Sequence, residues 1–196
     1  MPKKKSVKRA AQQFSQKAAQ TLHFLDSRSP QLSEEYVSWL HEYAVIRLYR
    51  EFERLVLEAL VGAINNDTSV FSEQAGVKFP PHLTDEVCEY LVTGGGYFDF
   101  KGRDGLIQRI RRYLPERHYL LTVLGTKNYK GPIDRLCALR NFAAHASPTS
   151  KAAAKKVLGA KKVGSAGSWP NKDNRFSQLV KSLQLLGNDM EKNAPY

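Results

Sequence analysis

The chain has 196 residues, of which 42% are hydrophobic, and it carries a net charge of +11. This length suits one domain, and the apolar content is sufficient for a sizeable core. No apolar run approaches the roughly 20 residues of a membrane-spanning helix. The basic start "MPKKKSVKRAAQQ" lacks the apolar segment of a secretory signal. We therefore expect a soluble, cytoplasmic protein with no membrane contact.

Apolar residues recur three or four positions apart through most of the chain, which is the spacing of one face of a helix. The predicted helical segments, in chain order, are residues 6–26, 33–64, a short helix from 84, 103–114, 128–147, a short lysine-rich helix at 149–158, and 173–187. The second begins at the N-cap candidate Ser33 and is the expected spine of the domain. No period-two alternation of any length occurs. We therefore predict an all-α fold, a bundle of about five helices.

The positive charge is concentrated at the two ends of the sequence. Residues 1–10 carry five basic residues and no acidic one, and residues 151–196 carry nine basic and three acidic residues. Residues 11–150 are neutral, with 16 charges of each sign. Cationic ends favour a polyanionic partner, of which nucleic acid is the usual one. A disordered basic arm that only maintains solubility would have the same composition.

These patterns predict the domain organisation. We expect a basic N-terminal arm over residues 1–9, one helical domain over 10–190, and a short tail over 191–196. The neutral composition of the central part is that of an ordinary globular domain.

Neither a metal site nor a nucleotide cofactor is indicated. Cys88 and Cys137 have no close-spaced partner, so we expect buried thiols in a reducing compartment rather than a disulfide or a metal site. The glycine-rich stretch "TGGGYFDF" at 93–100 lacks the Lys and Ser/Thr that follow the glycines of a phosphate-binding loop. It also lacks the preceding strand and following helix of a dinucleotide-binding turn. We interpret it as a flexible connector and expect no cofactor.

The segment "RNFAAHASPTSKAAAKK" at 140–156 carries the residues with catalytic potential. Arg140 and His145 lie five positions apart on a predicted helix, so their side chains are about 140° apart around its axis. A guanidinium fits a phosphate, and an imidazole exchanges a proton near neutral pH. The histidine could deprotonate an RNA 2′-hydroxyl while the arginine stabilises the phosphoryl oxygens, without a metal. A lone histidine near a helix end is, however, more often a structural or capping residue.

Several neighbouring residues are candidates for supporting roles. Asn141 shares a helix face with His145 and is within reach of a hydrogen bond. Lys151, Lys155 and Lys156 follow the pair and would bind flanking RNA phosphates, or they form the solvated face of a small helix. Glu53 on the long helix is a candidate acidic residue, although Arg50 offers it a surface partner. The angular separation of the pair leaves an open site on one chain, which two facing copies would close.

The segment "LRNFAAH" at Leu139–His145, late in an all-helical chain, resembles the signature of the HEPN superfamily. In that signature an Arg precedes a His by four to six intervening residues, often with a polar residue directly after the Arg. The stretch "YREFERLVLEAL" (49–60) is similar to the family's second helix, which packs against the motif helix. The similarity spans roughly residues 10–190. The chain length and the segment "FKGRDGLI" (100–107) resemble most the stand-alone HEPN proteins of the RiboL-PSP type in bacterial defence systems.

The resemblance implies a metal-independent endoribonuclease that acts as a homodimer, with its active site in the cleft between two motif helices. Arg140 and His145 match the family's catalytic pair, and Asn141 matches the polar position that supports it. Products would carry a 2′,3′-cyclic phosphate and a 5′-hydroxyl. Such proteins often act as toxins or anti-phage effectors, and a separate antitoxin or defence-system chain often restrains them.

A second interpretation is a non-catalytic helical module that binds RNA or a protein partner through its basic ends. The Arg140/His145 pair separates the two interpretations, because a pure binding module does not need a titratable group beside a core-facing stripe.

Overall fold

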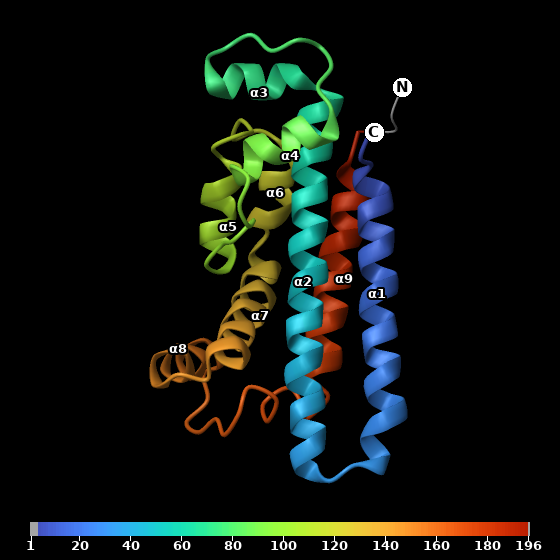
Figure 1. Ribbon diagram of the computed structural model, residues 1–196, viewed down its shortest axis with the longest axis vertical. Coiled ribbons are helices and arrows are strands. Elements are labelled where there is room, and N and C mark those ends of the chain that lie inside the picture. Colours follow the sequence, from blue (N-terminus) through green and yellow to red (C-terminus); the bar gives the residue numbers. More distant parts are fainter. Residues whose placement is uncertain (1–3, 196) are drawn as a thin grey trace.

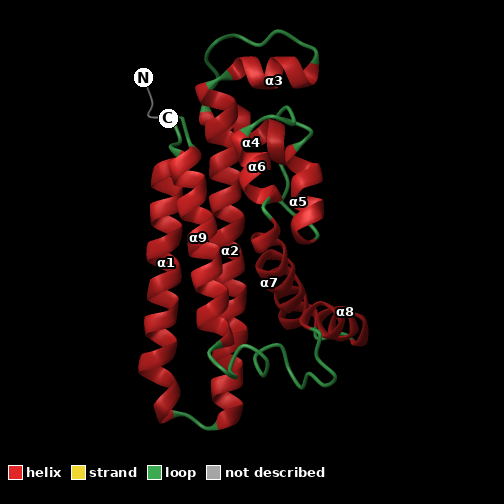
Figure 2. Cartoon of the chain, turned by 180° about the vertical axis from the view of Figure 1, so that it is seen from behind, coloured by secondary structure: helices red, strands yellow, loops and turns green. Residues whose placement is uncertain are grey.

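The computed structural model describes residues 4–195, and every regular element in that range is a helix (Figures 1 and 2). The predicted all-α class is confirmed, but this part of the chain forms nine α-helices instead of about five. They are α1 (Val7–Arg28), α2 (Glu34–Asn66), α3 (Thr68–Ala75), α4 (Asp85–Thr93), α5 (Gly102–Ile110), α6 (Tyr119–Gly125), α7 (Lys127–His145), α8 (Pro148–Leu158) and α9 (Arg175–Asn193). A short 3-10 turn, Ser29–Gln31, joins α1 to α2.

Three long helices form the body of the molecule. Helices α1, α2 and α9 run side by side, and α7 packs against α2 on the side away from α1 (Figures 1 and 2). Helices α3 to α6 gather around the C-terminal end of α2, while α8 projects from the end of α7. Across the described helices, none is both long and apolar enough to cross a bilayer. Helix α2 thus packs against α1, α3, α4, α7 and α9.

Helix α2 has nearly the boundaries that its sequence predicts, but its apolar stripe is buried only from residue 44 onward. The Ser33 side chain accepts a hydrogen bond from the Tyr36 backbone N–H, and two glutamates follow in the first turn at the positive end of the helix dipole. Leu48, Phe52 and Leu55 lie on the buried stripe. Removing such a fully buried ring, as in Phe52→Ala, costs about 3–5 kcal/mol. The spine expected from periodicity is therefore also the energetic centre of the core.

Two short helices occur where the sequence indicated only loops or turns. Asp67 ends α2, and its carboxylate also accepts from the Ser69 N–H at 3.0 Å, so the same residue begins α3. Gly76, with φ +67°, ends α3 in the left-handed conformation that favours glycine. His118 begins α6 by accepting from the Leu120 N–H at 3.3 Å. Both helices are too short for a periodic pattern to be detected in sequence.

The predicted arm is part of the helical body wherever it is described. The Lys4 ammonium donates to the Asn65 carbonyl at 2.8 Å, and the Lys5 ammonium pairs with Glu89 at 3.0 Å. Val7 is fully buried. Residues 4–9 thus pack with the helical body, which continues through α9 to a buried Ala194. Residues 1–3 of the arm and 196 of the tail lie outside the described residues.

Candidate active site

Helix α7 carries the predicted catalytic pair on the side that its core stripe leaves free. Ile133, Leu136 and Leu139 are fully buried against the body. Arg140 is half-buried beside α2, and His145 is the last residue of the helix and is exposed. The pair therefore lies where α7 leaves the body of the molecule.

The Arg140 guanidinium is held in place by an aromatic ring and an amide. Its central carbon lies 4.5 Å from the centre of the Tyr49 ring, a cation–π contact. Its Nη1 donates to the Asn141 side-chain oxygen at 2.9 Å. Tyr49 is itself stacked on Phe100 at 5.7 Å between ring centres. Within residues 4–195 the guanidinium makes no other hydrogen bond, so most of its donors remain free for a phosphate.

Asn141 supports the arginine and not the histidine. Sequence spacing allowed a hydrogen bond between Asn141 and His145, but the Asn141 oxygen accepts from Arg140 instead. No hydrogen bond or ring contact joins Arg140 to His145 in the part of the chain that the structure describes. The five-residue separation places them about 7.5 Å apart along the helix axis. A single chain thus brings Arg140 and Asn141 together and leaves His145 apart from them.

A sharp corner displays His145 to solvent. The next residue, Ala146, has φ +46°, and its N–H bonds back to the Phe142 carbonyl to close α7. Ser147 then begins α8 with a reciprocal capping box that includes Ser150. The corner is therefore fixed by backbone hydrogen bonds on both sides of the exposed imidazole.

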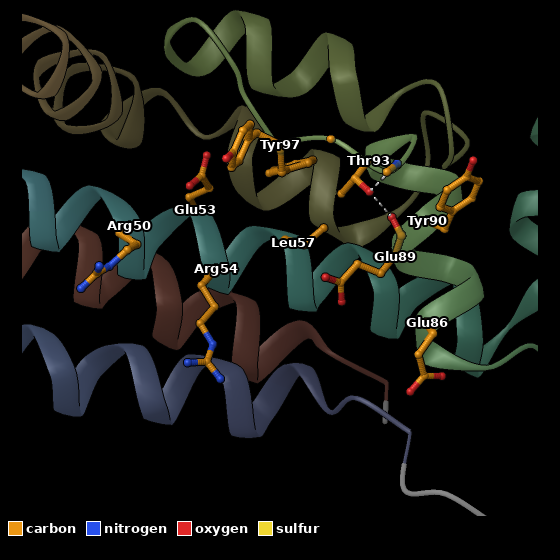
Figure 3. Close-up of a pocket in the computed structure, with 12 residues that line it drawn as sticks. Arg50, Glu53, Arg54, Leu57, Glu86, Glu89, Tyr90, Thr93 and Tyr97 are labelled. Atoms are coloured by element: carbon orange, nitrogen blue, oxygen red, sulfur yellow. Dashed lines mark hydrogen bonds between the residues drawn. The ribbon is translucent and has the colours of Figure 1, made fainter. Parts of the chain in front are cut away.

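Glu53 lies near Arg140 rather than pairing with Arg50. Burial raises the pKa of the Glu53 carboxyl, the nearby Arg140 guanidinium opposes this rise, and Asp99 adds to it. Among the described residues Arg50 and Glu53 form no ion pair, and Figure 3 shows the two side chains leaving α2 in different directions. The candidate acidic residue is therefore electrostatically coupled to the predicted catalytic arginine.

The glycine-rich connector after α4 packs against the Tyr49 ring that holds Arg140. Phe98 and Phe100 are buried, and Phe100 is the ring on which Tyr49 stacks. Arg109 donates to the Asp99 carbonyl at 2.8 Å and lies 4.8 Å from the Phe98 ring centre. The segment is thus tied to α2 and α5 by ring contacts and hydrogen bonds. Its alternating aromatic residues were the signal in the sequence.

Helix α8 extends the site with positive charge. Its apolar face is small: Ala154 packs with Phe142 and two loop residues in a separate minor core. Lys155 and Lys156 are exposed and Lys151 is half-buried. From Arg135 to Lys172 the sequence holds eight Lys or Arg residues and no acidic one. The corner between α7 and α8 is therefore cationic, which suits a polyanion.

A groove opens on the other side of Glu53, between α2 and the connector (Figure 3). It has a volume of about 570 Å³ and is lined by three glutamates, two arginines and two exposed tyrosines, namely Glu53, Glu86, Glu89, Arg50, Arg54, Tyr90 and Tyr97, among others. Its mixed charge makes it a poor general site for RNA. Sequence reasoning did not find it, because its walls come from two stretches, residues 50–57 and 86–98, that only the fold brings together.

The two cysteines are buried free thiols, as predicted. Burial raises the pKa of Cys88 to about 11 and that of Cys137 to about 12, so both stay protonated and unreactive at neutral pH. No cluster of three or more His, Cys, Asp or Glu side chains with metal-binding geometry occurs among residues 4–195.

Comparison of the chain with protein-family models, with curated proteins and with solved structures finds no match. Function therefore has to be inferred from the side chains of α7 and the groups around them.

Proposed function

We propose that this protein is a metal-independent endoribonuclease, with Arg140 and His145 as catalytic residues and Asn141 as a positioning residue. The observation that carries the proposal is a guanidinium fixed by Tyr49 and Asn141 with most of its donors free, on the same helix as an exposed imidazole. An anchored phosphate ligand and a mobile proton acceptor are the two groups that metal-free RNA cleavage needs. The HEPN-like "LRNFAAH" spacing favours the same roles.

In the proposed reaction, His145 removes the proton of an RNA 2′-hydroxyl. The 2′-oxygen attacks the adjacent phosphorus, and the bond from phosphorus to the 5′-oxygen breaks. The leaving oxygen takes a proton from an imidazolium or from water, which yields a 2′,3′-cyclic phosphate and a 5′-hydroxyl. Arg140 stabilises the charge that develops on the non-bridging oxygens, and Glu53 helps to orient the guanidinium.

The substrate is held by its backbone. Lys151, Lys155 and Lys156 lie within three turns of His145 and would bind the phosphates that flank the scissile bond. Because an extended phosphate backbone looks the same in every sequence, these contacts give affinity and no sequence preference. Any preference for a base must come from groups elsewhere on the surface.

A second copy would complete the site. Arg140 and His145 are not in contact within one chain, and two α7 ends that face each other would supply two arginines and two histidines to one cleft. We infer a homodimer that acts in the cytoplasm as a toxin or anti-phage defence effector. An antitoxin or a defence-system partner chain would restrain it.

One observation favours the alternative, a non-catalytic helical module that binds RNA or protein. Arg140 has a ring, an amide and a carboxylate around it inside its own fold, which is enough to account for its presence without catalysis. In that case the exposed His145 would have no role, and its loss would change nothing.

RNA cleavage in EDTA separates these functions. The wild type is compared with Arg140→Ala and His145→Ala, and with Arg112→Ala and His82→Ala as exposed controls of the same residue types. Cleavage of cellular RNA that survives EDTA, leaves cyclic phosphate ends and is lost only in the first two variants would support the nuclease. If the wild type cuts nothing, toxicity on expression in cells is measured for the same set. Harmless expression with all five proteins alike would favour the binding module.

A further inference from the structure

The N-terminal half of α2 exposes a line of large apolar side chains. The exposed fractions are 48% for Tyr36, 56% for Trp39, 53% for Tyr43 and 40% for Ile46, and Leu32 just before the helix is 39% exposed. These positions are three or four apart, so they form one stripe, which we call the α2 face. A contiguous apolar surface of this kind on a globular protein marks an interaction site.

A hollow borders the α2 face. It has a volume of about 280 Å³ and lies between α1 and α2, lined by Phe24, Tyr43 and Arg47 together with Gln20 and Thr21. Tyr36 and Trp39 stand one to two turns away as an edge-on pair with ring centres 5.1 Å apart. The surface thus carries both a projecting aromatic pair and a recess that can receive a large side chain.

Charges flank the α2 face with opposite signs at its two ends. Glu34 and Glu35 precede it, and Arg47 and Arg50 follow it. Within the described residues none of these four side chains forms an ion pair or a side-chain hydrogen bond to another residue. An acidic end and a basic end on one stripe complement each other when a second, identical stripe runs in the opposite direction.

We propose that the α2 face pairs with the α2 face of a second copy of this chain, with the two helices antiparallel. A pairing centred on residue 41 sets Trp39 of one copy against Tyr43 of the other, Tyr36 against Ile46 and the hollow, and Glu35 against Arg47. Each contact occurs twice, as a two-fold interface requires.

The area is adequate for such a dimer. With about half of each ring's roughly 200 Å² still exposed, the aromatic side chains Phe24, Tyr36, Trp39 and Tyr43 offer on the order of 400 Å². Leu32, Ile46 and the flanking charged residues bring the surface toward the roughly 800 Å² per partner of a standard interface. RNA is a poorer occupant, because α2 carries six glutamates and only three arginines and so repels a polyanion.

This arrangement also has a consequence for the active site, and that consequence rests on the proposed nuclease function. Helix α7 lies to one side of α2 (Figure 1), and a two-fold axis across α2 keeps both α7 helices on that same side. The loop after α8 is tied to α2 at Ser38 and Glu42, which places the end of α7 near the level of residue 41. Both His145 side chains would then lie on the same side of the dimer.

Light scattering of the full chain tests the pairing. From about 1 to 100 µM protein we expect the wild type to shift from 22.1 kDa to twice that mass. Trp39→Ser and Tyr43→Ser should raise the dissociation constant at least about 30-fold without loss of helical signal. Tyr97→Ser, which alters a residue that is 94% exposed elsewhere, should behave as wild type. A wild type that stays monomeric throughout, or serine variants that dimerise normally, would overturn the proposal.

A charge exchange tests the antiparallel direction. Glu35→Arg alone and Arg47→Glu alone should each weaken the dimer, and the two together should restore it. If each single change weakens pairing and the double variant is weaker still, the antiparallel arrangement is wrong. Failures remain distinguishable: a dimer that cuts no RNA removes the nuclease and leaves the pairing, whereas a monomer that cuts RNA does the reverse.

Discussion

The two sides of α2 depart from ordinary protein surfaces in opposite ways. Toward α7, the charged side chains of Arg140 and Glu53 are drawn into a half-buried position. On the α2 face, the large apolar side chains of Trp39 and Tyr43 are left in water. Burying charge and exposing aromatic surface both lower the stability of the monomer relative to a better-partitioned sequence. Each arrangement is understandable if the missing partner is a ligand or a second chain.

The difference between the sides indicates what each partner must provide. The Arg140 side already has its orienting contacts and lacks only an anion for the free guanidinium donors. The α2 face leaves about half of each large side chain uncovered and would recover about 25 cal/mol for each Å² of apolar surface that a partner covers. The first is a site for a small charged group, and the second is a surface for a protein. Variants on the two sides should therefore alter different measurements.

The largest expected effect is the loss of catalysis in His145→Ala. Removing a general base lowers the rate of cleavage by about 10²–10⁴-fold. Because His145 is exposed and at the end of α7, the melting temperature and the mass by light scattering should not change. RNA cleavage is measured beside His82→Ala, another exposed histidine. A His145→Ala protein that cuts RNA at the wild-type rate would refute the catalytic role.

A smaller loss is expected from Arg140→Lys. Lysine keeps the charge but cannot stack flat on Tyr49 or present a planar fork to a phosphate. We expect cleavage to fall by about tenfold or more, with a slightly lower melting temperature, and no change of mass. Arg112→Lys, at an exposed position, serves as the control. Full activity in Arg140→Lys would mean that only the charge matters and that the aromatic support has no catalytic consequence.

A still smaller effect is expected on RNA affinity from the double variant Lys155→Gln and Lys156→Gln. Each lost phosphate contact should reduce the slope of log affinity against log salt by about 0.7 for a single strand. Binding is measured by fluorescence anisotropy with the His145→Ala protein, which leaves the RNA intact. Lys181→Gln with Lys192→Gln removes two exposed lysines far from the site as the matched control. Equal salt slopes for the two double variants would exclude a specific role for α8.

Much of the architecture could be predicted from periodicity and capping. The spine α2 follows directly from a Ser33 cap and a long apolar stripe. The absence of a close-spaced partner led us to expect buried free thiols at both cysteines, and both are buried. Short elements were missed, because an eight-residue helix such as α3 has too few turns to show a pattern. Helix α3 begins at Asp67, which also ends α2. In the sequence such a residue indicates only the end of the first helix and not the start of a second one.

From the sequence, only those site residues could be predicted that lie together in one short segment. Arg140, Asn141 and His145 are visible in one short segment, but the support of Tyr49 and Phe100 depends on contacts between residues far apart in the sequence. Intrahelical spacing offered Arg50 as a surface partner of Glu53, whereas the charge that most lowers the Glu53 pKa is that of Arg140, on a different helix. Spacing along one helix does not reveal a charge that tertiary packing brings in from another.

The smallest effect is expected from Glu53→Gln, which tests the electrostatic interaction between Glu53 and Arg140. Burial raises the pKa of Glu53 in the folded protein, so the fold binds this proton more tightly than the unfolded chain does. This contribution to stability is present at low pH and is lost as pH rises from the ordinary carboxyl range through the raised folded value. The melting temperature of the wild type should therefore fall relative to Glu53→Gln over that window, on the order of 1–2 °C because solvent screens a half-buried group. Glu51→Gln is the matched control on the same helix.

The same measurement of melting temperature against pH shows whether Arg140 limits the rise in the pKa of Glu53. The guanidinium lowers the pKa of Glu53 against the effect of burial, so its removal in Arg140→Ala should raise that pKa further. The pH-dependent change in melting temperature caused by Glu53→Gln should then be larger in the Arg140→Ala background than in the wild type, because the two residues are coupled. An unchanged difference would mean that the carboxylate and the guanidinium do not sense each other. Glu53 would then have no part in orienting the catalytic arginine.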